Sequence, residues 1–437
     1  MFVPVTLRRG ALLLLSVVAA PAFAQDAAGP ATVNAADTAW IIAATGLVLF
    51  MTLPGLALFY GGLVRSKNIL SILIQCFAIT CVVSLLWLAA GYGLAFRDGG
   101  GLQDVIGGLD RAFLLGLSPA HAVGTIPEAV FFMFQLTFAI ITPALVIGGY
   151  AERIRFSVVL WFSALWLLLV YVPVTHWVWG GGWLAKLGVM DFAGGIVVHV
   201  NAGVAALVCA LVIGNRRGFP HVPMPPHNLP LVAAGAGMLW VGWFGFNGGS
   251  ALAANGTAGM AILATHLGAC SGALAWMLIE WRKYGKPSVL GLLTGVVAGL
   301  GTITPASGFV GPLGAVAIGF LAGTVCFFAT QLLKRVLHID DSLDVSPVHG
   351  VGGVLGSLLT AVFASVALGG TGFTVQHDML AQLGVQALGI AATIAWCGGM
   401  TWLLLKGLDA TLGLRVPEEG ESEGLDLAEH GERGYSP

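Results

Sequence analysis

Eleven long apolar runs occupy most of this chain of 437 residues, and they constrain its fold more than any other feature. Runs of about 20 apolar residues are what an α-helix needs to cross a hydrocarbon core about 30 Å thick. In soluble domains about a quarter of the residues are charged, whereas only 9% of the residues in this chain are charged. In addition, 57% of its residues are hydrophobic and its mean hydropathy is +0.91. The sequence therefore predicts an all-α polytopic membrane protein with eleven spans at 38–62, 69–95, 126–150, 156–179, 195–213, 230–250, 257–280, 287–304, 309–333, 347–368 and 380–410.

Basic residues alternate between the gaps that separate these runs. Every second gap and the tail carry most of them, namely Arg65/Lys67, Arg153/Arg155, Arg216/Arg217, Arg282/Lys283/Lys286, Lys334/Arg335 and Lys406/Arg415/Arg433. The other gaps hold only Arg97, Arg111 and Lys186. Because short cytoplasmic loops are enriched in Lys and Arg, the pattern predicts an external mature N-terminus and a cytoplasmic C-terminus.

Residues 1–24 have the pattern of a secretory signal peptide. Arg8 and Arg9 precede a short apolar stretch, which ends in small residues suited to cleavage. The alternative is an uncleaved first span, but the stretch is short for a span and Pro21 follows it. We expect the mature chain to begin near Gln25, outside the cytoplasm.

A weak internal repeat relates the two halves of the chain. His199 and Gly203 recur as His349 and Gly353, 150 residues later, and each half holds five predicted spans. After an odd number of spans the chain is on the opposite side of the membrane, so the second half of such a repeat would be inverted relative to the first. Inverted repeats place a shared site between their halves. Ionisable residues in a membrane mark pathways by default, although a lone histidine is more often a buried residue with satisfied hydrogen bonds. The sequence predicts a 5+5 inverted repeat plus a final helix.

Several strings, taken together and in order, resemble the ammonium transporter (Amt/Mep/Rh) family, on the bacterial Amt side. They are PGLALFYGGLVRSKN (54–68), AERIRFS (151–157), THWVWGGG (175–182), DFAGGIVVHVNAG (191–203), PHNLP (226–230), GWFGFNGGS (242–250), GKPS (285–288), TPASGFVG (304–311), DVSPVHGVGG (344–353), and GLRVPEE with EGLDLAEHGE in the tail. The resemblance implies a homotrimer in the bacterial inner membrane. Each protomer would have a central pore that takes up ammonium or ammonia, without enzymatic activity, cofactor or metal.

The resemblance implies an outer binding site made by Trp179, Phe138, Ser250 and Phe134. Ammonium is a small cation with N–H donors, so aromatic faces and an accepting oxygen suit it. The alternative for Trp179 is an ordinary residue of the interfacial aromatic belt.

Two further pairs are implied along the pore. Phe138 and Phe246 would form a gate above it, where the alternative is ordinary core packing. His199 and His349 would line the pore, share a proton and accept a hydrogen bond from ammonia without a fixed charge. We expect neutral ammonia to pass the histidines and the overall uptake to be electrogenic.

Asp191 and Asp344 are implied to be structural and electrostatic residues. Asp191 lies eight residues before His199, so it is at most about 12 Å from it along a helix axis. A carboxylate there would accept backbone N–H groups at the helix start, as a plain helix cap also would, and favour cations nearby.

The tail at 415–437 is acidic and polar. The alternatives are a disordered solvated segment or, from the resemblance, a cytoplasmic regulatory tail that contacts loops and a PII-type signalling protein. We expect 25–414 to be the transmembrane domain.

Three other classes are less consistent with the sequence. A sensor of the same family would carry a fused cytoplasmic signalling domain, and an Rh-type gas channel would lack the outer tryptophan. A membrane enzyme would need a nucleophile or a metal at suitable spacing from the histidines.

Overall fold

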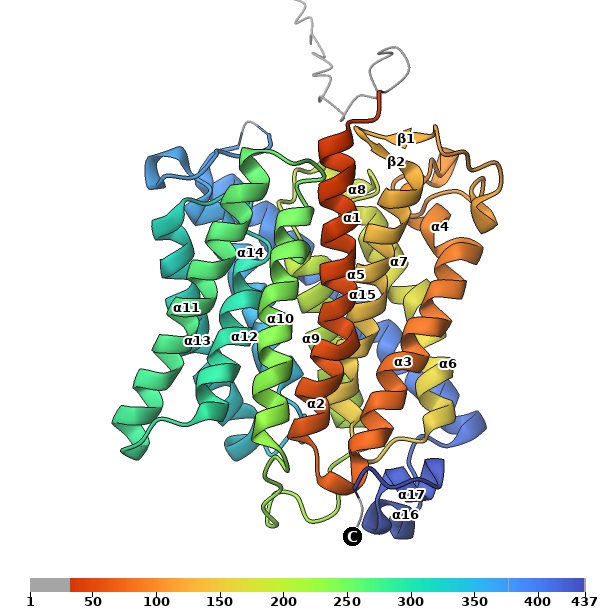
Figure 1. Cartoon of the computed structure of the whole chain (residues 1–437), viewed down its shortest axis with the longest axis vertical. Helices are drawn as coiled ribbons and strands as arrows, with labels where there is room; N and C mark the ends of the chain where they lie inside the picture. Colours follow the sequence, from red (N-terminus) through yellow and green to blue (C-terminus); the bar gives the residue numbers. More distant parts are fainter. Residues whose placement is uncertain (1–31, 376, 436–437) are drawn as a thin grey trace, which may run out of the picture. The chain divides into compact units, whose positions relative to one another are not determined.

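The computed structural model describes residues 32–375 and 377–435. The predicted signal peptide at 1–24 lies outside these residues. Figure 1 shows the long helices of the described part standing side by side, with β1 and β2 at one end and α16 and α17 at the other. We call these ends the hairpin end and the tail end.

The first half of the chain is helical apart from one short hairpin, in which Ala122 pairs with Pro127. Its elements are α1 (Ala35–Phe50), η1 (Met51–Leu56), α2 (Ala57–Leu63), η2 (Ser66–Asn68), α3 (Ile69–Leu86), η3 (Trp87–Gly91), α4 (Tyr92–Phe96), η4 (Gly100–Leu102), η5 (Ala112–Leu114), β1 (Ala122–Val123), β2 (Ile126–Pro127), α5 (Glu128–Tyr150), α6 (Phe156–Trp166), η6 (Leu167–Tyr171), α7 (Val172–Val178), α8 (Trp183–Lys186), η7 (Gly195–Val200) and α9 (Asn201–Ile213).

The second half is helical throughout its described elements. They are α10 (Leu229–Gly249), α11 (Gly256–Tyr284), α12 (Val289–Ile303), α13 (Pro312–Gln331), η8 (Leu332–Val336), η9 (Ser346–Gly350), α14 (Val351–Phe363), η10 (Val366–Leu368), α15 (Met379–Leu412), α16 (Glu418–Glu423) and α17 (Leu425–His430). The η segments are single turns of 3₁₀- or π-helix, several of which continue directly into α-helices.

Ten helical segments among the described residues are long and apolar enough to cross a membrane. The predicted span at 287–304 corresponds to α12, which is apolar but has only 15 residues. The multi-pass helical class is thus confirmed, whereas the count of eleven spans stays a prediction.

The tail is folded against the loops of the tail end, unlike a disordered segment. Arg415 pairs with Ile154 in a single β-bridge, and the Ser71 N–H donates to Asp426 at 2.8 Å. The Asn68 side chain accepts a hydrogen bond from the Leu425 N–H at 2.8 Å. These contacts connect the tail to the loops after α2 and α5.

Candidate functional site

The carboxylate of Asp191 begins the segment that carries the first histidine. It accepts hydrogen bonds from four successive backbone N–H groups, those of residues 194, 195, 196 and 197, at 2.5 to 3.0 Å. The first N–H groups of a helix have no acceptor within the helix itself, so a carboxylate that accepts them stabilises the helix start. Asp191 therefore fixes η7, in which His199 lies.

The segment of the second histidine starts in a similar way, but with a residue that the sequence analysis did not select. Asp341 accepts the Ser346 N–H at 2.6 Å at the start of η9. Asp344, which the sequence analysis selected as a structural and electrostatic residue, binds Lys334 at 2.8 Å. Asp341 lies 150 residues after Asp191, so the repeat spacing could have identified it.

The two histidine-bearing segments run in opposite directions. Arg216, beyond the end of α9, binds Asp340, before the start of η9. At the other end, Phe192 before η7 packs on Phe309 with ring centroids 5.4 Å apart, and the Phe309 carbonyl accepts the N–H of Thr371, beyond α14. This is the arrangement that an inverted repeat predicts.

Glycines bring these antiparallel segments into backbone contact. A Cβ on Gly203 would lie 2.1 Å from the Gly350 Cα, and a Cβ on Gly353 would lie 3.0 Å from the Val200 nitrogen. The offset of 150 residues relates Gly203 to Gly353 and Val200 to Gly350, so the two contacts are equivalent.

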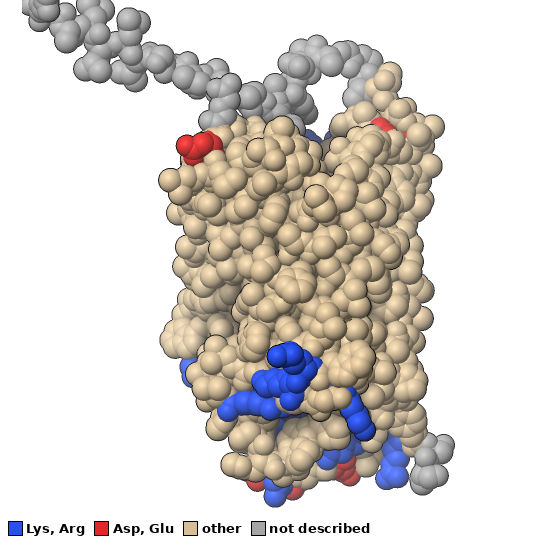
Figure 2. Space-filling model, turned by 90° about the vertical axis from the view of Figure 1, so that its left-hand side faces the viewer, with Lys and Arg blue, Asp and Glu red and all other residues tan. Residues whose placement is uncertain are grey.

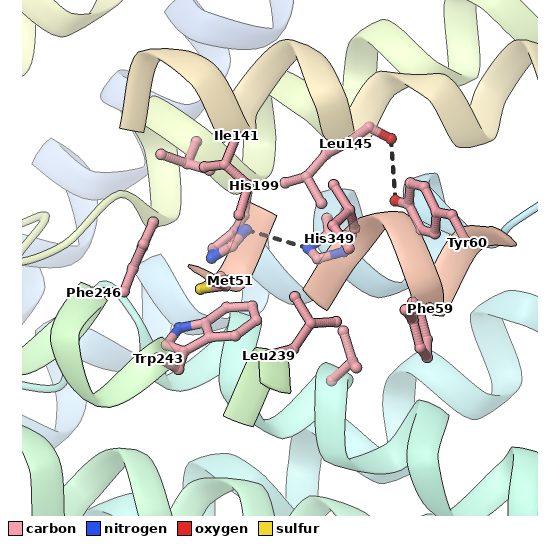
Figure 3. A pocket seen from close by; sticks show the side chains of 13 residues that line it. Met51, Phe59, Tyr60, Ile141, Leu145, His199, Leu239, Trp243, Phe246 and His349 are labelled. Atoms are coloured by element: carbon pink, nitrogen blue, oxygen red, sulfur yellow. Dashed lines mark hydrogen bonds between the residues drawn. The ribbon is translucent and has the colours of Figure 1, made fainter. Parts of the chain in front are cut away.

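The histidines meet where the segments cross. The Nδ1 atoms of His199 and His349 lie 3.2 Å apart, so one neutral ring can donate to the other. Both side chains are buried, and the His199 Nε2 has no hydrogen-bond partner among the described residues. Figure 3 shows both rings within one narrow cavity, with Ile141 and Leu145 nearby.

Trp243 is a site residue that the sequence analysis missed. The Trp243 ring stacks on the His199 ring, with centroids 5.5 Å apart. Its Nε1 donates to the Thr304 hydroxyl at 2.9 Å. It lies three residues before Phe246, and residues three apart share a helix face. That spacing could have identified it.

The predicted aromatic residues form a continuous chain above the histidines. Phe138 and Phe246 stack with centroids 4.1 Å apart, and the Phe246 ring lies 6.2 Å from that of His199. Phe138 also contacts Phe134 at 5.1 Å and Trp179 at 5.8 Å, both edge to face. Phe134, Phe138 and Phe246 are buried, whereas Trp179 is partly exposed.

Hydrogen bonds hold the outer polar groups of this chain. The Trp179 Nε1 donates to the Asp191 carbonyl at 2.8 Å, and Ser250 Oγ donates to the Phe246 carbonyl at 2.8 Å. Ser250 follows Gly249, which packs against the Phe134 ring. Because its only proton is used, the Ser250 hydroxyl presents its oxygen as an acceptor.

A wider cavity opens below the histidines toward the tail end. It shares His349, Tyr60 and Phe59 with the narrow cavity and is further lined by Lys334 and Asp344, among others. We call this wider cavity the vestibule. The aromatic chain, the histidine pair and the vestibule thus follow one another along a single line.

A buried ionic cluster fixes the loops at the tail end. Glu152 binds Arg216 at 2.6 Å, accepts the Arg65 N–H at 2.7 Å and accepts from the Asn68 amide at 2.8 Å. Burial alone would raise the pKa of Glu152, but Arg216 and Arg65 lower this pKa from 4.5 to about 2. Arg216 also binds Asp340, so the cluster joins the loops after α2, α5 and α9 to the start of η9.

Within the described residues, no group of three or more His, Cys, Asp or Glu side chains is placed to hold a metal ion.

Comparison with known proteins gives one consistent result. The sequence profile of the Ammonium Transporter Family matches residues 39–435. An ammonium transporter of Aquifex aeolicus is 45% identical over 428 residues, covering 97% of this chain and 98% of the relative. One of Bacillus subtilis is 44% identical over 402 residues, covering 91% and 98%.

Solved structures agree with the sequence relatives. The structure of a sensor Amt protein matches with a TM-score of 0.84 and 33% identity, covering 90% of this chain and 98% of that one. The crystal structure of Saccharomyces cerevisiae Mep2 matches with a TM-score of 0.82 and 38% identity, covering 89% and 91%.

The fold and the site define a multi-pass helical membrane protein with a narrow, mostly apolar cavity that contains two histidines. With these relatives, the chain belongs to the ammonium transporter family. This is a family of transporters.

Proposed function

We propose that this protein takes up ammonium across the bacterial inner membrane by binding the cation at an outer aromatic site and conducting ammonia past the two histidines. One spatial relationship supports the proposal most. A single path runs from the outer aromatic residues past the stacked phenylalanines and the histidine pair into the vestibule.

The outer site consists of Trp179, Phe138, Ser250 and Phe134. Aromatic faces attract a cation by about 0.5–2 kcal/mol each, depending on how far water is excluded. The Ser250 oxygen can accept one of the ammonium N–H groups, because its own proton is donated to Phe246. A hydrated ion gains less there, since it keeps its water.

The stacked rings of Phe138 and Phe246 form the gate. Both rings are buried and apolar, so they offer the substrate no hydrogen-bond partner. Ammonium therefore gives up a proton near this gate, and the neutral ammonia enters the apolar cavity at a much smaller desolvation cost than the ion.

The histidine pair receives the ammonia. The free His199 Nε2 offers a hydrogen bond, and the Nδ1 contact lets the rings share a proton. Both η7 and η9 begin near the pair, and the positive ends of their dipoles disfavour a cation between them. Potassium carries no proton to release, so the same path excludes it.

Transport is proposed to be electrogenic, with the released proton also crossing and ammonium re-forming in the vestibule. Current measured on purified protein in liposomes under an ammonium gradient, with and without a proton gradient, tests this. A steady inward current supports it, and ammonia flux without current contradicts it.

The orientation is proposed from the charges. Lys and Arg gather near the tail end on the face that Figure 2 draws. The positive-inside rule then makes the tail end cytoplasmic, so the mature N-terminus, with residues 1–24 removed as a signal peptide, is periplasmic.

Assembly and regulation complete the proposal. Residues 25–414 form the transmembrane domain of one protomer of a homotrimer, and residues 415–437 form a regulatory tail. The docked position of α16 and α17 beside the cytoplasmic loops suits a PII-type signalling protein that covers the vestibule exit. Asp191 acts mainly as a structural cap and adds negative charge near the outer site. Asp344 has a structural and electrostatic role in the vestibule, where it binds Lys334.

A further inference from the structure

A buried glutamine of α15 holds the chain just before Asp191. The Gln386 side chain is fully buried, and its Oε1 accepts the Met190 N–H at 2.8 Å. Its Nε2 donates to the Met190 carbonyl at 2.8 Å and to the Ser357 carbonyl of α14 at 3.0 Å. Because a backbone N–H only donates and a carbonyl only accepts, the orientation of this amide is fixed. One side chain therefore binds both polar backbone groups of Met190 and joins them to α14.

Met190 leads directly into Asp191, which contacts two parts of the candidate site. The Asp191 carbonyl accepts the Trp179 indole N–H at 2.8 Å, and the Asp191 carboxylate accepts the N–H groups that begin η7, in which His199 lies. Because Met190 and Asp191 are adjacent, a shift of Met190 would move both contacts. The Gln386 amide is thus connected to the outer site and to the first histidine.

Further polar contacts from α15 hold the same region. Gln382, one turn before Gln386, donates to the Gly188 carbonyl at 3.0 Å and to the Gln386 Oε1 at 3.2 Å. On the other side of η7, the Cys397 Sγ donates to the Asn201 carbonyl at 3.2 Å. The helix α15 therefore fixes the chain both before and after η7.

The second histidine-bearing segment has an equivalent contact. The offset of 150 residues relates Met190 to Asp340 and Asp191 to Asp341, which caps η9. The buried Arg153 guanidinium donates to the Asp340 carbonyl at 2.7 Å. In each half, a buried side chain thus donates to the carbonyl of the residue before the capping aspartate. The donor is a cation at the tail end and a neutral amide near the outer site, where a buried positive charge would repel a cationic substrate.

We propose that Gln386 is a positioning residue for ammonium transport, which holds Met190 and thereby sets Asp191, the Trp179 ring and the start of η7. Gln386 is not among the residues that line the narrow cavity or the vestibule, so it acts through this chain of contacts. Its effect on ammonium binding rests on the proposed outer site, whereas its effect on the chain before η7 does not.

The test compares Gln386→Met, which keeps the approximate size of the side chain and removes its hydrogen bonds, with a matched control on the same helix. Thr401→Val is that control, because the buried Thr401 hydroxyl accepts the Trp166 indole N–H of α6 at 3.0 Å. Hydrogen exchange of residues 188–200 is measured by mass spectrometry on the purified full chain in detergent. Apparent ammonium affinity is measured from the current in liposomes, with and without Trp179→Leu.

We expect Gln386→Met to exchange at least about fivefold faster within residues 188–200, since several hydrogen bonds are lost and each contributes a factor of about two to ten. Thr401→Val should leave exchange in this stretch unchanged. Apparent affinity should fall by about two- to tenfold in Gln386→Met, but not further when Trp179→Leu is already present, because both changes act through the same ring.

Unchanged exchange within residues 188–200, an equal acceleration in Thr401→Val, or an affinity loss that adds in full to that of Trp179→Leu would overturn the proposal. If Gln386→Met does not elute as folded protein, Gln386→Glu must show the faster exchange, because it lacks at least one of the two donations. If Trp179→Leu alone leaves the affinity unchanged, the proposed outer site is wrong. The exchange rates then decide by themselves whether Gln386 holds the chain before η7.

Discussion

Gly203 lies so close to Gly350 that a Cβ on Gly203 would fall 2.1 Å from the Gly350 Cα. Gly203 is one helical turn after His199, and Gly350 directly follows His349. The contact between the two glycines therefore sets the separation of the two imidazoles.

Gly203→Ala should push these segments apart. Overpacking at such a contact costs typically 1–3 kcal/mol, and we expect the histidine contact to lengthen and ammonium transport to fall. Gly399→Ala is the matched control, because nothing lies within 4 Å of its added Cβ. The unfolding temperature and the ammonium transport rate should fall only in Gly203→Ala. Equal values for Gly203→Ala and Gly399→Ala would refute this role of Gly203.

Glu152 makes stability depend on acid pH. Its folded pKa of about 2 lies below the ordinary value of 4.5. The ionised form therefore stabilises the fold fully above pH 4.5, and this stabilisation, on the order of 3 kcal/mol, is lost as the pH falls from 4.5 towards 2. Thermal unfolding in detergent at pH 7, 5 and 3 measures it.

Glu152→Gln provides the comparison for that measurement. It leaves Arg216 short of a buried partner, so we expect a loss of about 3–5 kcal/mol at pH 7, and position 152 then contributes no further loss between pH 5 and 3. The interpretation fails if wild type and variant lose the same stability over that interval.

Trp179→Leu should weaken apparent ammonium affinity by a modest factor, about 2- to 30-fold, because one cation–π contact of about 0.5–2 kcal/mol is lost. The concentration dependence of the current measures it, and Trp402→Leu, an exposed tryptophan of α15, is the control. Trp179 also donates to the Asp191 carbonyl. Loss of folded protein would therefore point to packing as its main role.

Deletion of residues 415–437 should leave a folded protein with reduced or deregulated transport and without binding of a PII-type protein. The tail contributes contacts from Glu421 to the Arg217 N–H at 2.6 Å and from Asp426 to the Ser71 N–H at 2.8 Å, in the loop after α9 and in the first turn of α3. If neither transport nor binding of a co-expressed PII protein changes, the regulatory role is wrong.

The helical membrane class could be predicted from the sequence, because long apolar runs have few alternatives in a bilayer. The limit appears at 287–304, where the apolar run is long but the helix α12 has only 15 residues. Run length reports hydrophobicity, whereas the helix bounds depend on caps, such as Ser288, which accepts the Gly291 N–H at 2.9 Å.

The site shows a different limit. Spacing alone puts each histidine near a helix start, and their contact depends on two antiparallel segments crossing at glycines 150 residues apart. Asp341 was missed because three acidic residues, Asp340, Asp341 and Asp344, precede the second histidine. The structure separates their roles, because Asp340 binds Arg216, Asp344 binds Lys334 and Asp341 caps the helix.

The central claim is that the pair of His199 and His349 conducts ammonia and excludes ions that carry no proton. Replacing His199 with Ala removes the Nδ1 contact and leaves His349 short of a hydrogen bond, at a stability cost of roughly 1–3 kcal/mol. The folded assembly should survive this loss, which size-exclusion chromatography checks.

The most direct measurement is the current of purified His199→Ala in liposomes, under an ammonium gradient and then under a potassium gradient, beside the wild type. We predict that the ammonium current collapses or that potassium begins to pass. A variant that folds and assembles like the wild type, carries the wild-type ammonium current and still excludes potassium would contradict the role of the histidine pair.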